Sequence, residues 1–315
     1  MNSEQLGWLR TMRSRRVFGD AARTHDMFAH AQNEMANYLS SSGHRFLRTL
    51  ELVKRVTPAG ARVLEIGANP YFVTAVLLRN FKLDATSMGR PPEVWPGSPL
   101  SLTKQERYLE VEGDSFRLEE VVCNAEKDRF PVDSVAFDLV IAAEILEHLI
   151  FSPTHFLCEI HRVLKPGGHL ILTTPNASQL RYLFKWIAGR HSVWDQYSGY
   201  GVYGRHQREY TAHEVEELLR STNFTVASTE RYYSQPLNGK LDTKMMKLVY
   251  AGLRSRAPEM TFLARATGET KVCYPEFLYR SLYPVPNSVD EMIAFGNQDA
   301  RAARRAPAAQ ERATK

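Results

Sequence analysis

Short apolar runs alternate with longer amphipathic segments through the middle of the chain. Alternation at this spacing predicts a doubly wound α/β fold with a mostly parallel sheet. The runs expected to form strands are residues 62–67, 83–88, 118–124, 137–143 and 169–174. The segments expected to form helices are residues 70–80, 144–150, 153–164 and 211–222.

The two ends of the chain follow different patterns. Residues 1–57 are mostly helical in pattern and stop at a Pro-Ala-Gly turn, so they are interpreted as an N-terminal helical extension. Residues 224–232 and 260–266 predict two further strands, seven in all, separated by a helical segment at about 241–255. The predicted organisation is therefore an extension (1–57), a main domain (58–266) and a C-terminal extension (267–315).

The net charge of +5 is concentrated at the two ends of the 315-residue chain. Residues 301–315 carry +4 and residues 1–24 carry +3, so the body between them carries 5 − 4 − 3 = −2. This distribution argues against a nucleic-acid partner. The basic tail, from about residue 297, is interpreted as a solvated end, with contact to an anionic membrane surface as the second reading.

Three cysteines, far apart and without a C-x-x-C pair, favour neither a disulfide framework nor a zinc site. The first residues lack the apolar core of a signal peptide, and no apolar run is long enough to cross a membrane. We therefore expect a reduced, cytoplasmic protein.

The run Val63–Ile66 predicts a buried strand that ends in a glycine turn at Gly67 and leads to a helix starting at Pro70. A turn of this kind faces a helix N-terminus and lets a ligand approach the backbone closely. Many α/β proteins contain such a turn, so a plain structural role for Gly67 is equally compatible with this segment alone.

Three more motifs follow it along the chain, and the ensemble is specific although no single piece is. With the first, they resemble class I S-adenosylmethionine-dependent methyltransferases over roughly residues 60–266. The four segments are Val63-Leu-Glu-Ile-Gly67; Asn124-Ala-Glu126 with Phe130-Pro; Phe137-Asp-Leu-Val-Ile-Ala-Ala-Glu-Ile-Leu-Glu-His-Leu149; and Val163-Leu-Lys-Pro-Gly-Gly-His-Leu-Ile-Leu-Thr-Thr-Pro-Asn176.

The resemblance implies a Rossmann-like methyltransferase sheet with S-adenosyl-L-methionine across the carboxyl ends of its parallel strands. It assigns the amino-acid end of the cofactor to the glycine turn, the adenine to the end of the third strand, and the methionine portion to the end of the fourth. The implied cofactor-binding residues are Glu65, Gly67, Ala68, Asn69, Ser87, Asn124, Ala125, Ala143 and Glu144. Glu65 as a helix-cap acceptor and Asn124 as a turn residue are the simpler alternatives.

This chain departs from the family pattern at two places. The loop Gly67-Ala-Asn-Pro-Tyr71 has one glycine where the family has two or three. Ser87 stands where the family has an acidic residue for the ribose hydroxyls, and Asp84 falls three residues early, on the opposite face of the strand. Both changes favour a weaker cofactor site and keep a non-catalytic, methyltransferase-like subunit as an alternative.

Residues 176–210 are rich in Trp and Tyr and end in Arg205-His-Gln-Arg-Glu-Tyr210, a composition typical of a substrate lid. His206 is the predicted general base, because histidine exchanges a proton readily near neutral pH. Arg208, Glu209 or Tyr210 would orient the acceptor or the histidine. His148 is a weaker alternative base, and an ordinary surface hinge capping the next helix is the competing interpretation.

No clustered Asp/His set demands a metal. Similar H-x-R-E-Y-T sequences occur in sugar and glycan methyltransferases, and related Leu-Glu-His enzymes act on quinone phenols. We therefore expect O-methylation of a small molecule, with a sugar, glycan or glycolipid precursor first and a quinone or phenolic metabolite as the alternative. A nicotinamide oxidoreductase is disfavoured because G-x-G-x-x-G is absent.

Overall fold

The computed structural model describes residues 13–18, 21–26, 32–81, 83–89, 103–111, 113–190, 204–233, 252–275 and 277–278. The aromatic residues between 191 and 203, most of the predicted helix at 241–255 and the basic tail lie outside these ranges. None of the described helices is long and apolar enough to cross a membrane.

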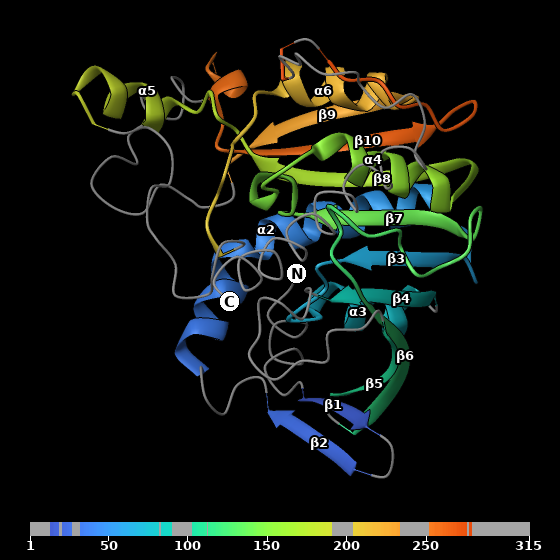
Figure 1. Cartoon of the computed structure of the whole chain (residues 1–315). Coiled ribbons are helices and arrows are strands. Elements are labelled where there is room, and N and C mark those ends of the chain that lie inside the picture. The colour runs from blue at the N-terminus through green and yellow to red at the C-terminus, as the bar shows by residue number, and fades with distance from the viewer. Residues whose placement is uncertain are drawn as a thin grey trace, which may run out of the picture.

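The described strands form one ten-stranded sheet in the order β2-β1-β5-β6-β4-β3-β7-β8-β10-β9. Figure 1 shows the sheet as a continuous stack with β1 and β2 at its lower end. The strands are β1 (Arg13–Phe18), β2 (Ala21–Asp26), β3 (Arg62–Ile66), β4 (Asp84–Gly89), β5 (Thr103–Val111), β6 (Asp114–Val122), β7 (Phe137–Ala143), β8 (Leu164–Pro175), β9 (Phe224–Tyr232) and β10 (Glu259–Ala266).

Seven of these strands are the seven predicted from the sequence. β6, β4, β3, β7 and β8 pair in parallel, while β10 pairs antiparallel with β8 and with β9. Among the described residues, helices connect β3 to β4 (residues 72–81) and β7 to β8 (residues 153–163). The predicted α/β, mostly parallel Rossmann-like sheet is therefore confirmed, with three additional antiparallel strands (β5, β1 and β2) at one edge.

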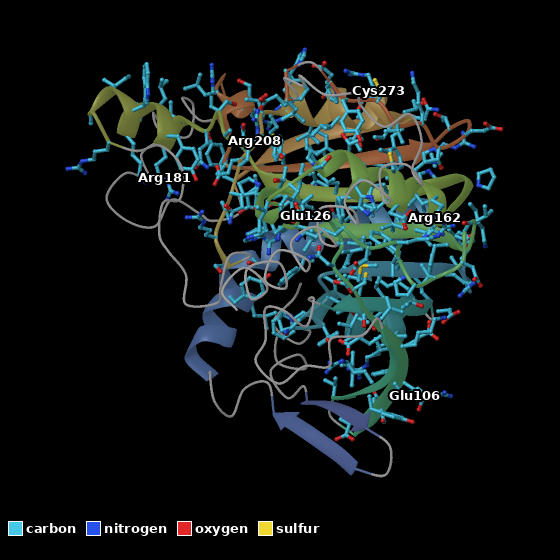
Figure 2. The ribbon with its side chains drawn as sticks, viewed as in Figure 1. Glu106, Glu126, Arg162, Arg181, Arg208 and Cys273 are labelled. Carbon is cyan, nitrogen blue, oxygen red and sulfur yellow. The ribbon has the colours of Figure 1, made fainter. Side chains whose placement is uncertain are left out.

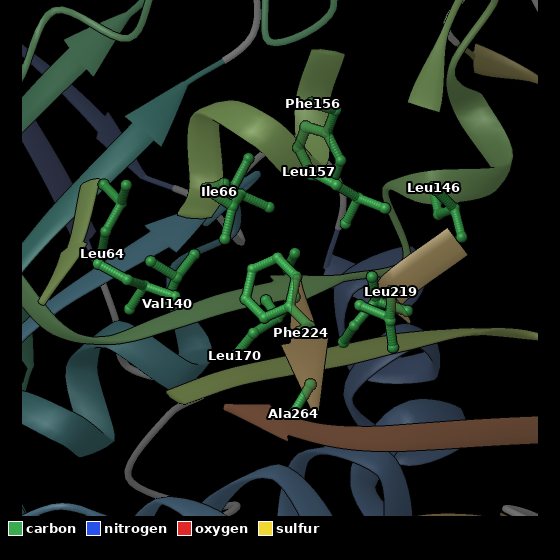
Figure 3. Packing of buried hydrophobic residues seen from close by; sticks show 14 of the residues in the cluster. Leu64, Ile66, Val140, Leu146, Phe156, Leu157, Leu170, Leu219, Phe224 and Ala264 are labelled. Carbon is green, nitrogen blue, oxygen red and sulfur yellow. The ribbon is translucent and has the colours of Figure 1, made fainter. Parts of the chain in front are cut away.

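The helices cover both faces of the sheet. One hydrophobic cluster contains residues of α4 and α6 and the other contains residues of α2 and α3, so the sheet lies between two apolar layers. Figure 3 shows residues of the first layer, among them Leu64 and Val140 of the sheet, Phe156 of α4 and Leu219 of α6. The helices are α2 (Gln32–Val56), α3 (Phe72–Val76, continued by a π-helical stretch Leu77–Phe81), α4 (Pro153–Val163), α5 (Leu180–Ile187) and α6 (Ala212–Ser221).

Local signals explain where several elements start and end. The strand β3 is buried at four of its five positions, as expected for an apolar run in the middle of a parallel sheet. The Thr211 side chain accepts from the Glu214 backbone N–H, and the Glu214 carboxylate accepts from the Thr211 N–H. This capping box fixes the start of α6, as the sequence predicted.

Three local predictions were wrong. Residues 13–26 form a β-hairpin rather than helix, paired through β1 to β5. The helix after Gly67 starts at Phe72 rather than Pro70, because Tyr71 just before it is left-handed with φ 68°. The predicted helix at 144–150 is reduced to the 3-10 turn Leu146–His148.

Candidate active site

Gly67 lies at the carboxyl end of β3, in a turn that only glycine fits. Its φ is +70°, and a Cβ added there would lie 2.3 Å from Cδ1 of Ile145. Its backbone N–H donates to the Met88 carbonyl at 2.9 Å, which ties the ends of β3 and β4 together. Gly67 therefore lets three strand ends (β3, β4 and β7) approach one another closely.

Tyr71 connects the glycine-poor loop, residues 67–71, to β5 and β6. Its side chain is buried, its hydroxyl donates to Oε1 of Glu120 on β6, and its ring lies 4.5 Å under the Arg107 guanidinium carbon. Arg107 also donates to both carboxylate oxygens of Glu120, at 2.9 and 2.8 Å. A buried carboxylate is tolerated only when it is paired and hydrogen-bonded, and here both conditions hold.

Glu65, Ser87 and Glu120 lie side by side on β3, β4 and β6. Glu65 is buried and accepts a hydrogen bond from the Thr74 hydroxyl of α3. Burial raises the pKa of Glu65 to about 7, and the Thr74 hydrogen bond opposes that rise. Ser87 is fully buried two residues before the end of β4, and its hydroxyl has no hydrogen-bond partner among the described residues.

Ala68 and Asn69 sit in the Gly67 turn, Ala68 buried and Asn69 exposed. Asn124 and Ala125 follow β6. The Asn124 side chain accepts from the Glu126 N–H at 3.0 Å, so it closes a turn. Ala125 is half-buried at the rim of this turn and packs against the hydrophobic core.

Glu144 follows Ala143, the last residue of β7, in a left-handed conformation with φ 55°. Its carboxylate accepts from the Thr173 hydroxyl at 2.8 Å and pairs with Nη1 of Arg45 at 3.0 Å. Arg45 comes from α2 and is almost fully buried, and its second amino group donates to the Tyr38 hydroxyl. Burial is the largest single influence and lowers the pKa of Arg45, but the charges of Glu144, Tyr38 and Glu259 together outweigh it, so the pKa is raised.

Glu147 and His148 form the 3-10 turn beyond Glu144. Glu147 is fully buried and accepts from the Thr174 hydroxyl at 3.0 Å, while its other carboxylate oxygen has no hydrogen-bond partner among the described residues. Burial, and then the nearby Glu144 charge, raise the pKa of Glu147 well above its ordinary value. Glu147 is therefore protonated more readily than an exposed carboxylate.

The segment that returns from the predicted lid is fixed to this turn. The Glu147 carbonyl accepts from the Gln207 N–H at 2.7 Å, and the Arg205 carbonyl lies 3.0 Å from Nδ1 of His148. The His148 and His206 rings meet edge to face, with centroids 5.0 Å apart. His206 therefore lies at the carboxyl end of β7, the edge where the cofactor residues are predicted.

A buried carboxylate orients His206. Nδ1 of His206 lies 2.7 Å from Oε1 of Glu209, whose side chain is 0% exposed. The Tyr182 hydroxyl of α5 donates to the same oxygen at 3.0 Å. The carboxylate selects the tautomer with its proton on Nδ1, so Nε2 carries the lone pair that can take a proton.

The other two predicted catalytic residues, Arg208 and Tyr210, have side-chain contacts of their own. Arg208 is exposed, donates to the Glu214 carboxylate at 2.9 Å and lies over the Tyr210 ring. Tyr210 is 2% exposed and belongs to the core cluster. These side-chain contacts lie near the start of α6, and the catalytic roles of Arg208 and Tyr210 stay predictions.

The structure also groups Glu147, His148 and His206, with one ligand atom from each within 4.8 Å of the others. One carboxylate and two imidazoles form a donor set suited to a divalent transition metal. Sequence reasoning found no such cluster because His206 lies 58 positions beyond His148 and reaches it only through the returning lid segment. The expected absence of a metal stays a prediction.

The seven-stranded order, the glycine turn and the polar residues at four neighbouring strand ends define a class I S-adenosylmethionine-dependent methyltransferase. The comparison with protein families agrees. A family described as "Methyltransferase domain" matches residues 31–229, more than half of the chain, and the chain belongs to that family. Its cofactor is S-adenosylmethionine, as the motifs predicted.

Several curated relatives are O-methyltransferases. The mitochondrial ubiquinone biosynthesis O-methyltransferase of Mus musculus is 27% identical over 208 residues, covering 64% of this chain and 52% of the relative. The ubiquinone biosynthesis O-methyltransferase of Pseudomonas syringae is 27% identical over 146 residues, covering 46% of this chain and 57% of the relative. The chain thus spans about half the length of these relatives.

Solved structures are similar to the chain at TM-scores below 0.5. One is described as a complex between the Haloferax volcanii Trm112 methyltransferase activator and the putative methyltransferase, with a TM-score of 0.48 and 15% identity. That match covers 77% of this chain and 97% of the solved one. A Burkholderia thailandensis 1,6-didemethyltoxoflavin-N1-methyltransferase has a TM-score of 0.43 and 18% identity, covering 76% of this chain and 84% of the other.

Proposed function

We propose that this protein transfers the methyl group of S-adenosylmethionine to a hydroxyl oxygen of a small molecule, with His206 as the general base. The observation that carries the proposal is the contact between Nδ1 of His206 and the buried Glu209 carboxylate at 2.7 Å. A histidine held in one tautomer by a carboxylate is an arrangement suited to general-base catalysis.

The chemistry assigns a separate task to each part of the site. When bound, the cofactor supplies a sulfonium methyl carbon, which the acceptor oxygen attacks in line as the carbon–sulfur bond breaks. Nε2 of His206 takes the hydroxyl proton, and Glu209 stabilises the imidazolium that forms. Tyr182 holds the Glu209 carboxylate in place by its hydrogen bond.

The relatives favour an aromatic hydroxyl as the acceptor. The ubiquinone biosynthesis O-methyltransferases support the quinone or phenolic alternative, and these relatives give no support to the sugar or glycan precursor placed first from the sequence. We therefore propose a phenolic quinone precursor. The cytoplasmic location stays a prediction, supported by three free cysteines.

Cofactor binding separates this proposal from a non-catalytic subunit. Calorimetry with S-adenosylhomocysteine is expected to show a one-to-one complex. If no binding is seen at millimolar ligand, the non-catalytic subunit is the hypothesis that remains. Transfer of labelled methyl groups to a panel of catechols, phenols and sugars, with and without a chelator, then identifies the acceptor class and any need for a metal.

The role of His206 is tested with acceptors of different acidity. His206→Ala is expected to lower kcat by about 10²- to 10⁴-fold on a weakly acidic phenol, with cofactor affinity unchanged. The loss should shrink for phenols that are already ionised, because they need no base. His213→Ala, at an exposed histidine of α6, is the matched control. An equal loss of kcat on all phenols would show that His206 is not the general base.

A further inference from the structure

The helix α5 carries apolar side chains that the described part of the chain leaves exposed. Trp186, Ile187 and Phe184 are 71%, 69% and 63% exposed, and Leu183 is 43% exposed. Tyr182 is the buried residue of the helix. Figure 1 shows α5 at the upper left, standing out from the sheet and its covering helices.

This clustering differs from ordinary surface hydrophobicity. Single exposed apolar residues are normal on soluble proteins, and Val135 and Phe151 are examples here. On α5, by contrast, four large apolar residues fall within five consecutive positions, 183–187. A contiguous apolar patch on one projecting helix marks a surface that binds something.

The charge of the segment indicates what it binds. Residues 176–194 contain no Asp or Glu, while Arg181, Lys185 and Arg190 are basic. Figure 2 labels Arg181 on the outlying α5, away from the sheet. A second copy of this helix would bring like charges together, whereas an anionic lipid surface attracts them. Tryptophan beside basic residues is also typical of helices that lie in a membrane interface.

We propose that α5 docks this protein on an anionic membrane surface, with Leu183, Phe184, Trp186 and Ile187 inserted at the level of the lipid headgroups. The basic side chains of the same helix then contact lipid phosphates. Eight residues are too few to span a bilayer, so the helix lies in the interface rather than crossing it.

Docking through α5 also places the catalytic base at the membrane. Tyr182, on the buried side of α5, donates to Glu209 at 3.0 Å, and Glu209 holds His206. An acceptor dissolved in the bilayer therefore has a short route to His206. This last step rests on the proposed function, whereas the docking itself does not.

The test is sedimentation of the full-length protein with vesicles at physiological salt. We expect binding to vesicles of phosphatidylglycerol and phosphatidylcholine, and much weaker binding to phosphatidylcholine alone. Phe184→Ser with Trp186→Ser, both at exposed positions, should reduce the bound fraction at least tenfold. Arg181→Gln with Lys185→Gln should weaken binding to the anionic vesicles by roughly tenfold or more.

Two controls keep the result interpretable. Val135→Asp changes an exposed apolar residue outside α5 and should bind like the parent. A variant with glutamine at the five basic residues of 301–315 separates α5 from the basic tail. Thermal melts and S-adenosylhomocysteine binding verify that each variant is folded, and they report on the cofactor site independently of membrane binding.

Three outcomes overturn the proposal. The first is no binding to anionic vesicles, and the second is unchanged binding of the α5 variants with loss in the tail variant. The third is a dimer that dissociates in the Phe184→Ser/Trp186→Ser variant, since the patch would then be covered by a second copy. If membrane binding holds but no methyl transfer is found, the proposed function fails while the docking helix stands.

Discussion

Glu65 offers a quantitative check on the cofactor edge of the sheet. It is 6% exposed at the end of β3, and the Thr74 hydroxyl is its hydrogen-bond donor. Burial raises its pKa from the ordinary 4.5 to about 7. The perturbation is Glu65→Gln, which removes the ionisable group but keeps the shape and an oxygen that can accept from Thr74.

The magnitude follows from the two pKa values. Between pH 4.5 and 7 the folded protein retains the Glu65 proton that the unfolded chain has released, so stability falls as the pH rises through this window. A rise from 4.5 to about 7 corresponds to roughly 3 kcal/mol above pH 7, because each pKa unit is worth about 1.36 kcal/mol. Below pH 4.5 both states are protonated and the cost vanishes.

The assay is urea unfolding of parent and variant, without cofactor, at pH 5 and pH 8. We expect Glu65→Gln to gain about 2.5 kcal/mol relative to the parent between these two values, as ionisation of the parent becomes costly. Glu51→Gln, at an exposed glutamate of α2, should show no such difference. A parent–variant gap that is the same at both pH values would refute the reasoning, because Glu65 would then be ionised alike in both states.

Gly67→Ala is expected to weaken S-adenosylhomocysteine binding and to destabilise the fold by roughly 1–3 kcal/mol in urea unfolding, because the new Cβ would lie 2.3 Å from Ile145 at φ +70°. Arg45→Met should cost roughly 1–3 kcal/mol by leaving the half-buried Glu144 carboxylate without its cation, and adding Glu144→Gln should recover part of it in a double-mutant cycle. Phe156→Ala, at a fully buried ring, should cost about 3–5 kcal/mol in the same assay, and a loss under 1 kcal/mol would contradict the packing.

The apolar periodicity predicted the parallel sheet because buried parallel strands consist of continuous apolar runs, and β3, β7 and β8 all have that pattern. The β-hairpin at 13–26 could not be predicted in this way. Its sequence, rich in arginine, lacks an apolar face, and the pairing with β5 that holds it is a contact between segments about 90 residues apart.

Some contacts of the candidate site could likewise be predicted from the sequence, and others could not. His206 and Glu209 are three positions apart, so sequence reasoning could suggest that one orients the other, and the structure brings them together at 2.7 Å. Nothing in the sequence pattern indicated that Arg45 or Tyr182 belongs to the site. Each lies on a helix, α2 or α5, and only folding brings that helix close to the ends of the strands. Arg208, Glu209 and Tyr210 were equal candidates by sequence, and only geometry separates the carboxylate from its neighbours.

From the sequence, the loop at residues 67–71 with its single glycine favoured a weak cofactor site. In the structure, contacts of Tyr71 fix the shape of this loop in place of the backbone freedom that more glycines would give. Glycine-rich loops are shaped by backbone freedom, whereas here Tyr71 is held in a left-handed conformation by Glu120 and Arg107 beneath it. Arg107 lies on β5, one of the three strands added to the seven-stranded core. A buried ion pair is strongly destabilised when one partner is removed, so the loop depends on β5 for its shape. The extra edge of the sheet therefore supports the Gly67 turn, and the departure in the loop and the addition to the sheet form one structural unit.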